Sequence, residues 1–171
     1  MTSGILGMNS TLVERGGTRQ KIWDMRFLNM ARLVSKWSKD PSTQVGAVIV
    51  TPENVIVSVG YNGFAQAMPD DERYYSNRDE KYSRIVHSET NAIVLARGDV
   101  RGHTLYVTLP PCDRCAVTII QAGISRVVCP EVTNGDAERR WQEAFARATQ
   151  YFDESGVVFE RVNDSQATDR A

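Results

Sequence analysis

The sequence predicts an α/β fold in three layers, with a five-stranded mixed sheet between helices. Two apolar segments separated by the turn Pro52-Glu53-Asn54 are typical of a β-hairpin. After them, segments with helical periodicity alternate with short apolar strands, which is the order expected for parallel crossover connections. The chain has 171 residues, enough for one domain with a substantial core, and it shows no internal repeat or linker.

The first part of the chain is expected to supply one helix and the hairpin. Residues 1–19, rich in Gly, Ser and Thr, are expected to form a flexible arm or a cap on a neighbouring subunit. Apolar residues recur at three- and four-residue spacing from Gln20, which predicts a helix that ends before Asp40-Pro41. Residues 44–51 form a nearly continuous apolar run, as in a strand buried on both faces, and residues 55–60 alternate like a second strand.

A long polar segment, residues 61–84, follows the hairpin. Such a segment is usually functional when it has no regular structure, or else it contains short helices that the pattern does not resolve. Beyond it, helix and strand alternate: a helix from Val86 ended by Gly98, a strand at 105–109, a helix at 112–121 capped by Gly123, a strand at 126–129, a helix at 136–150 and a strand at 157–160. Residues 20–162 are thus the predicted domain, and residues 163–171 a loose tail.

Composition excludes several classes of function. The formal net charge is -1, so the chain has no overall electrostatic footprint for nucleic acid. No apolar run approaches the length of a membrane span, and the N-terminus lacks a signal-peptide apolar core. Three cysteines, an odd number, argue against a disulfide framework. We therefore expect a cytoplasmic protein, in which a Cys-x-x-Cys pair is metal-binding or redox-active.

Two short segments, His87-Ser88-Glu89 and Pro111-Cys112-Asp113-Arg114-Cys115, carry three metal-ligand side chains and a carboxylate. One His and two Cys suit zinc, which takes imidazole nitrogen and thiolate sulfur in tetrahedral geometry. Three protein ligands leave one position for water, as in a catalytic site, whereas a structural zinc site normally has four. Glu89 is placed to handle protons on the water that zinc activates.

The Cys-x-x-Cys pair has two alternative interpretations, a redox pair and a structural zinc site. A redox pair is disfavoured because the motif does not follow a thioredoxin-like first strand and a proline precedes it. A structural site needs a fourth ligand, but Cys129 ends an apolar strand and is more consistent with a core residue, while His103 lies in a turn. His87 and Cys112 both fall at expected helix N-termini, where ligand crevices form in α/β sheets, which favours a catalytic site.

His-x-Glu followed by Pro-Cys-x-x-Cys is the signature of the zinc deaminases. The similarity extends beyond that signature, across about residues 20–160. Segments 38–50, 60–63, 87–93 and 106–116 resemble those of the deoxycytidylate (dCMP) deaminase family. The resemblance implies a cytidine-deaminase-like fold, a five-stranded sheet between helices, often assembled as a hexamer.

The resemblance also implies a reaction, its ligands and its site residues. The reaction is hydrolytic deamination of dCMP to dUMP and ammonia with Zn2+ as cofactor. Expected effectors are dCTP as activator and dTTP as inhibitor, with Mg2+ accompanying a bound nucleoside triphosphate. The implied residues are Glu89 for catalysis, His87, Cys112 and Cys115 for the metal, Asn62, Thr43, Ser88 and Lys39 for substrate, and Gly60, Tyr61, Gly63 and Arg97 for regulation.

This chain departs from the family pattern at two places. Ser88 stands where an alanine is common, and a tyrosine often found shortly after the fourth strand is missing from residues 129–133. The phosphate contacts therefore stay open. The candidates are Lys39, Ser42, Thr43, Arg78, Lys81 and Arg84. The alternative functions are a nucleic-acid base deaminase of the tRNA adenosine deaminase type and a non-catalytic zinc-binding module.

Overall fold

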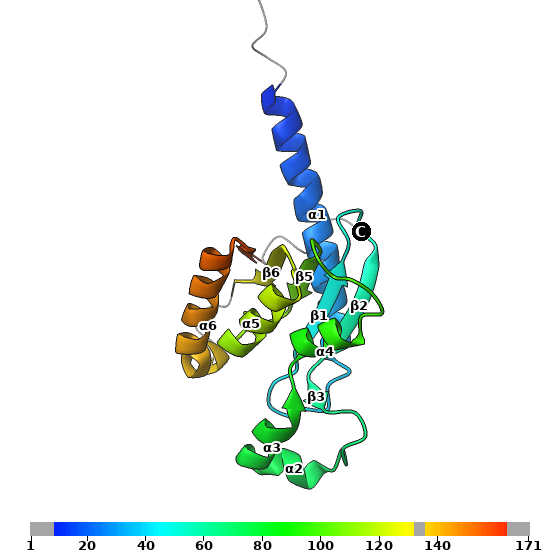
Figure 1. The fold of residues 1–171 in the computed structure, drawn as a ribbon, viewed down its shortest axis with the longest axis vertical. Coiled ribbons are helices and arrows are strands. Elements are labelled where there is room, and N and C mark those ends of the chain that lie inside the picture. The colour runs from blue at the N-terminus through cyan, green and yellow to red at the C-terminus, as the bar shows by residue number, and fades with distance from the viewer. Residues whose placement is uncertain (1–8, 132–135, 164–171) are drawn as a thin grey trace, which may run out of the picture.

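The computed structural model describes residues 9–131 and 136–163 (Figure 1). Its sheet consists of β1 (Gly46–Val50), β2 (Ile56–Tyr61), β5 (Thr104–Val107), β6 (Arg126–Pro130) and β7 (Val158–Val162). The strand order is β2-β1-β5-β6-β7. Strand β1 pairs antiparallel with both β2 and β5, whereas β5, β6 and β7 are parallel. The predicted five-stranded mixed sheet, with its hairpin and parallel crossovers, is confirmed.

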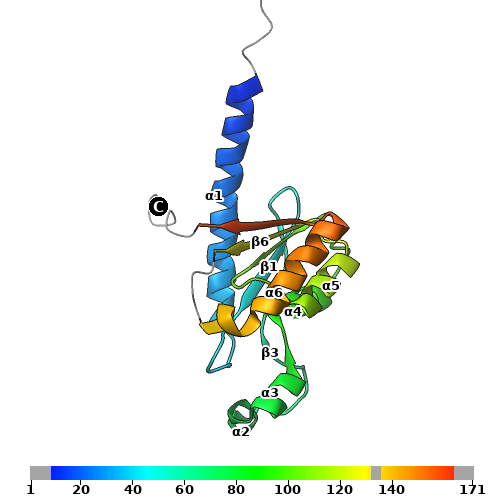
Figure 2. The same ribbon diagram turned by 90° about the vertical axis from the view of Figure 1, so that its left-hand side faces the viewer.

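One face of the sheet is covered by α1 (Asn9–Ser35), as Figure 2 shows. Phe27, Leu28 and Ala31 of this helix pack with Val48 and Tyr106 of the sheet. The helix begins at Asn9, earlier than the predicted start at Gln20, so residues 9–19, which were expected to belong to a flexible arm or a cap on a neighbouring subunit, are helical. The sequence there contains two consecutive glycines, which lower helix propensity by roughly 1 kcal/mol each but do not prevent helix formation. The rest of the expected arm lies outside the described residues.

The other face is covered by α4 (Ser88–Leu95), α5 (Asp113–Gln121) and α6 (Asp136–Ser155). Side chains alternate along each strand, so residues next to those that face α1 point to this side. Ile49, Leu105 and Val127 of the sheet are fully buried here, together with Ile119 of α5 and Phe152 of α6. Three layers result, as predicted. None of the helices in the described ranges is long and apolar enough to cross a membrane.

The segment 61–84 contains short helices, which was one of the two interpretations of its sequence. They are α2 (Glu72–Ser76) and α3 (Arg78–Arg84). Asp71 and Asn77 start them, because their side chains accept hydrogen bonds from the first backbone N–H groups of each helix. A separate two-stranded ribbon, β3 (Gly63–Phe64) paired with β4 (Ile85–Val86), carries both helices below the main sheet (Figure 1).

Several predicted boundaries shift in the structure. Helix α4 ends at Leu95 with Ala96 as its cap, so the predicted cap at Gly98 is wrong. Gly123 has φ +77° directly after the cap residue of α5, which agrees with its predicted capping role. Helix α6 continues past the predicted end at 150, and Gly156 with φ +75° follows it.

Gly60 and Gly46 let two helices approach the hairpin closely. A Cβ atom on Gly60 would lie 2.3 Å from the carbonyl oxygen of Ser88 and 2.4 Å from the nitrogen of Ala92. A Cβ atom on Gly46 would lie 2.1 Å from the carbonyl oxygen of Ala31 on the other face. Both obstacles are backbone atoms, so neither position accommodates a side chain without moving a helix. Gly60 therefore fixes where α4 begins.

Replacing Gly60 with alanine is expected to destabilise the fold by about 1–3 kcal/mol, because the new methyl group must push α4 away from β2. Since α4 follows His87 directly, the same variant should bind zinc more weakly. Denaturant unfolding and zinc content after dialysis measure the two effects. Gly98→Ala is the matched control, since a Cβ there meets no atom within 4 Å. Equal behaviour of the two variants would contradict the packing argument.

Candidate metal centre and active site

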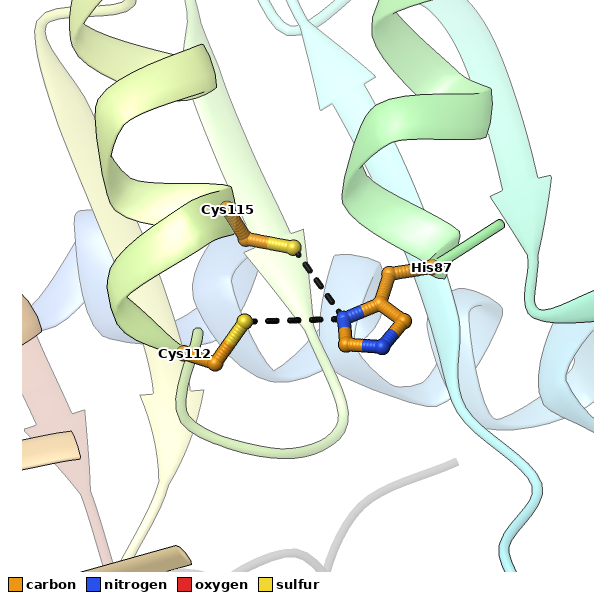
Figure 3. A group of neighbouring side chains, drawn as sticks. All are labelled: His87, Cys112 and Cys115. Atoms are coloured by element: carbon orange, nitrogen blue, oxygen red, sulfur yellow. Dashed lines mark hydrogen bonds between the residues drawn. The ribbon is translucent and has the colours of Figure 1, made fainter. Parts of the chain in front are cut away.

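The three predicted metal ligands meet at the starts of α4 and α5 (Figure 3). His87 is the N-cap residue of α4 and Cys112 that of α5, with Cys115 one turn further on. His87 Nδ1 lies 3.6 Å from Cys112 Sγ and 3.3 Å from Cys115 Sγ. The three ligand atoms all lie within 4.8 Å of one another. Both halves of the sequence signature therefore form one cluster.

The geometry of this cluster fits zinc. Tetrahedral zinc, with Zn–N of about 2.0 Å and Zn–S of about 2.3 Å, places the nitrogen roughly 3.5 Å from each sulfur. The observed separations lie close to that value. Within the described residues, neither Cys129 nor His103 joins the cluster. Cys129 is fully buried in the core, as predicted. The described part of the chain thus offers three ligands, the number typical of a catalytic zinc site.

Hydrogen bonds within the cluster favour one thiolate, that of Cys112, while the bond to Cys112 raises the pKa of the Cys115 thiol. A hydrogen bond from Cys115 lowers the pKa of Cys112 to about 4, although burial opposes the shift. The hydrogen bond to Cys112 raises the pKa of His87 to about 9. An anionic thiolate beside an imidazole is the arrangement in which a metal ion replaces the shared proton.

Glu89 lies in the first turn of α4, next to the metal ligands. Its side chain is buried, and burial raises the pKa of its carboxyl group. The hydroxyl of Ser88, also buried, donates a hydrogen bond of 2.9 Å to Glu89 Oε2. This bond holds one carboxylate oxygen and leaves Oε1 for another partner. A carboxyl group with a raised pKa is able both to accept and to return a proton near neutral pH.

One cavity of about 640 Å³, including its part open to solvent, is lined by two of the metal ligands, His87 and Cys112, and by Glu89. Its walls come from the segment before β1, from the end of β2, and from α3 and α6. The lining residues also include Thr43, Asn62, Lys81, Tyr82, Arg140 and Trp141.

Asn62 and Thr43 are two of the predicted substrate residues that line the cavity. Asn62 also holds the segment before β1 in place. Its Oδ1 accepts a hydrogen bond of 2.8 Å from the Val45 backbone N–H, and its Nδ2 donates one of 2.9 Å to the Thr43 carbonyl oxygen. Ser88, predicted to contact substrate, lies beside Glu89 and is not among the lining residues.

The other predicted residues lie away from the cavity lining. Lys39 is exposed and its Nζ lies 2.6 Å from Asp70 Oδ2. Tyr61 is 39% exposed and packs edge-on against Trp37, with ring centroids 6.1 Å apart. Arg97 is exposed after α4. Gly60 has the packing role described above, and Gly63 belongs to β3.

Sequence reasoning missed the contribution of α6 to the site. Trp141 and Phe145 of this helix line the cavity together with Arg140. Tyr82 of α3 packs edge-on against Trp141, with ring centroids 6.0 Å apart. The two adjacent arginines before Trp141 could have indicated that α6 contributes to a binding site. Arginines in such positions are equally typical of a solvated helix face.

Residues 21–131 match the family model for the cytidine and deoxycytidylate deaminase zinc-binding region. The chain belongs to this deaminase family. The deaminase in the luxG 3′ region of Aliivibrio fischeri, described as uncharacterised, is 48% identical over 135 residues, which cover 79% of this chain and 90% of that protein. Human deoxycytidylate deaminase is 41% identical over 145 residues, covering 81% of this chain and 79% of the human protein.

Solved structures show that the deaminase shares its fold with relatives of different specificity. A dCMP deaminase from cyanophage S-TIM5, in complex with dCMP and dUMP, has a TM-score of 0.62 and 23% identity, with 91% of this chain and 100% of that chain covered. A diaminohydroxyphosphoribosylaminopyrimidine deaminase/reductase from Thermotoga maritima has a TM-score of 0.57 and 25% identity, with 81% of this chain and 36% of that chain covered. The fold alone therefore does not name the substrate.

Proposed function

We propose that this deaminase hydrolyses dCMP to dUMP and ammonia. The observation that carries the proposal is buried Glu89 beside the His87–Cys112–Cys115 cluster, with Glu89, His87 and Cys112 lining one solvent-connected cavity. The substrate comes from the relatives, since chains 38% to 42% identical to this one are described as deoxycytidylate deaminases or probable ones.

Zinc, when bound by His87, Cys112 and Cys115, supplies a Lewis acid that makes water a nucleophile near neutral pH. Glu89 carries the protons of the reaction. We expect Glu89 Oε1 to accept a proton from the attacking water, while the Ser88 hydroxyl holds Oε2. The same carboxyl group then donates that proton to the pyrimidine ring nitrogen. It next accepts the second proton, from the new hydroxyl group on the ring carbon, and donates it to the amine, which departs as ammonia when the C–N bond breaks. One residue with a raised pKa thus serves as base and then as acid.

Asn62 and Thr43 are the proposed contacts to the rest of the nucleotide. Asn62 Oδ1 accepts from Val45 and retains a second lone pair, which suits a sugar hydroxyl donor. The Thr43 backbone N–H donates to Asp40 Oδ1 at 3.2 Å, so the segment that carries the threonine is fixed before substrate arrives. Both residues line the cavity.

The proposals for regulation and assembly rest on the resemblance to the deoxycytidylate deaminase family. We propose a cytoplasmic homohexamer, activated by dCTP and inhibited by dTTP, with Mg2+ accompanying a bound triphosphate. Exposed apolar side chains support subunit contacts: Val94 and Leu95 of α4 are 71% and 57% exposed, and Leu33 and Trp37 are 52% and 53% exposed. Sedimentation velocity with and without dCTP tests the assembly.

The proposed substrate is tested by ammonia release from dCMP, dCTP, cytidine and tRNA, each with and without dCTP and dTTP. We expect dCMP to be preferred and its saturation curve to shift with the effectors. Activity confined to tRNA would identify a nucleic-acid base deaminase instead. Zinc-loaded protein that releases ammonia from none of them would be a binding module. An unchanged dCMP saturation curve would remove the regulatory part of the proposal alone.

A further inference from the structure

We propose that Asp40 is a positioning residue for the deamination, which acts through its ion pair with Lys81. The pair holds the α2–α3 insert, residues 65–84 between the strands of the β3–β4 ribbon, against the wall of the cavity that is proposed to contact the nucleotide. This inference rests on the proposed function and deepens it, because it concerns how the same cavity keeps its shape. Neither residue is assigned a contact with the reacting atoms.

Asp40 is a buried carboxylate that accepts hydrogen bonds from three parts of the chain. Its exposed fraction is 2%. Its Oδ1 accepts from the backbone N–H groups of Ser42 and Thr43, at 2.8 and 3.2 Å, and from the Lys81 ammonium group at 2.7 Å. Its Oδ2 accepts from Asn62 Nδ2 at 3.4 Å. One carboxylate thus joins the segment before β1, the end of β2 and helix α3.

The groups that Asp40 holds belong to the cavity wall. Thr43 and Asn62 line the cavity together with Glu89, and so do Asp40 and Lys81. The Asn62 amide is fixed from its Nδ2 side by the Thr43 carbonyl oxygen and by the Asp40 carboxylate. Displacing that carboxylate would loosen the Asn62 amide and the Thr43 backbone together. It would leave Glu89 and the metal ligands in place, since they lie at the starts of α4 and α5.

Lys81 supplies the charge that balances Asp40. It is itself buried, and its ammonium group donates to Asp40 Oδ1 and to the Ser42 hydroxyl oxygen. The Ser42 hydroxyl in turn donates to Asp40 Oδ1 at 2.9 Å. Burial tends to raise the pKa of Asp40, but the hydrogen bonds from Lys81, Ser42 and Thr43 keep that pKa below its ordinary value of 3.8. Removing either partner would leave a buried charge without its counter-charge, which is strongly unfavourable.

An exposed ion pair joins the same two segments. Lys39 Nζ lies 2.6 Å from Asp70 Oδ2, and the Tyr75 hydroxyl donates to Asp70 Oδ1 at 2.9 Å. The side chains of Lys39 and Asp70 are 67% and 37% exposed, so solvent screens their attraction. The buried Asp40–Lys81 pair is therefore the one expected to hold the insert in position.

The α2–α3 insert is linked internally by ring and charge contacts. Phe64, directly before it, stacks on Tyr75 of α2 with ring centroids 4.3 Å apart. Arg84 of α3 lies over the Tyr74 ring of α2 at 4.2 Å and pairs with Glu80 at 2.7 Å. Because α2 and α3 are joined in this way, a bond from one side chain of the insert positions the rest of it.

Tyr82, the residue after Lys81, carries that position to another part of the cavity. It lines the cavity and packs edge-on against Trp141 of α6. Arg78 lies over the Tyr82 ring at 5.3 Å. Arg78 and Arg84 were candidates for the phosphate contacts, but neither is among the lining residues. Their contacts support the insert instead.

The test uses Asp40→Asn, Lys81→Met and the double variant in the zinc-loaded full chain. Glu80→Gln is the matched control, because it makes the same change from carboxylate to amide but breaks a pair within α3. Steady-state kinetics with dCMP separate KM from kcat. Calorimetric titration with dUMP and with deoxyuridine measures binding with and without the phosphate. Hydrogen exchange of the free proteins measures how firmly residues 40–45 and 78–84 are held.

We expect Asp40→Asn to raise KM for dCMP by about 10- to 100-fold and to leave kcat within about threefold of wild type. The Kd values for dUMP and deoxyuridine should rise by the same factor, because the pair positions the wall rather than contacting the phosphate. Lys81→Met should act in the same direction, and the double variant should be no worse than the weaker single one. Exchange should become faster at residues 40–45 and 78–84 but not at 113–121. Glu80→Gln should match wild type.

A purely structural role would reduce the fraction of folded protein, which lowers the apparent kcat and leaves KM unchanged. That result would overturn the proposal, as would an Asp40→Asn protein that exchanges like wild type. Weakened binding of dUMP alone would also overturn it, since the network would then act on the phosphate. Should the wild type deaminate no dCMP, the proposed function fails, while the exchange measurement still decides whether Asp40 holds the insert.

Discussion

Replacing Glu89 with glutamine is expected to lower kcat for dCMP by about 10²- to 10⁴-fold while zinc stays bound. Glutamine has nearly the same shape and still accepts the hydrogen bond that the Ser88 hydroxyl donates in the structure. It cannot accept a proton from water or return one to the ring. Because Glu89 is not among the three ligand residues, the metal content should be unchanged. Ammonia release and zinc analysis on the same preparation measure both quantities.

Ser88→Ala is the matched comparison for that variant. It removes the hydrogen bond to one carboxylate oxygen but keeps the proton carrier. We expect a kcat loss of about threefold to tenfold, the typical effect of one hydrogen bond. A Glu89→Gln variant that retains wild-type turnover would refute the proposed mechanism. A variant that loses its zinc would show instead that Glu89 maintains the metal centre.

Replacing Arg126 with methionine is expected to lower the free energy of unfolding by about 3–5 kcal/mol. Arg126 makes a bidentate pair with Asp24 of α1, at 2.8 Å to Oδ1 and 2.9 Å to Oδ2, and it also contacts Glu160 of β7. Tyr106 donates a further bond of 2.8 Å to Asp24 Oδ1. Asp24 is 3% exposed, so the variant would leave a buried carboxylate without its cation. Denaturant unfolding at pH 7 measures the loss.

The loss should depend on pH. Burial tends to raise the pKa of Asp24, but hydrogen bonds from Arg126, Gln20 and Tyr106 outweigh it and keep that pKa below its ordinary value of 3.8. A lowered folded-state pKa gives stability that is present above the unfolded value and is lost as pH falls through the folded one. Without Arg126, burial dominates and raises the folded-state pKa, so the variant should gain stability relative to wild type between pH 7 and pH 5.

Arg101→Met is the control for the Arg126 variant. Its side chain is 78% exposed and pairs with Asp99 at the surface, so its removal should leave stability at pH 7 unchanged within error. An Arg126→Met protein as stable as wild type, or one whose deficit grew toward pH 5, would contradict the buried-pair argument.

Sequence patterns were sufficient to predict features that depend on residues close together in the chain. The hairpin around Pro52-Glu53-Asn54 follows from turn chemistry and apolar runs, and the structure has it. Cys112 and Cys115 are close in sequence at a helix start, so their convergence follows from helix geometry. His87 joined them because the signature pairs it with the cysteines, and the structure brings all three together.

Features that depend on contacts between distant residues could not be predicted from a single sequence. Asp24 and Arg126 are charged residues on separate elements, and their pairing becomes evident when α1 lies across β6. Lys81 was a candidate phosphate ligand, but no pattern near it in the sequence indicated its hydrogen bond to Asp40. Arg140 looked like a solvated helix residue until α6 was placed beside the cavity.

The β3–β4 ribbon separates the segment that contributes to the cavity wall from the sheet that positions the metal ligands. Helices α2 and α3 leave and re-enter the domain through neighbouring strands, so the segment between them can change length without moving the sheet that positions His87 and the cysteines. The same segment supplies Lys81 and Tyr82 to the cavity wall. Changes in this segment can therefore alter what the cavity admits, while the two helix ends that carry the metal ligands stay in place.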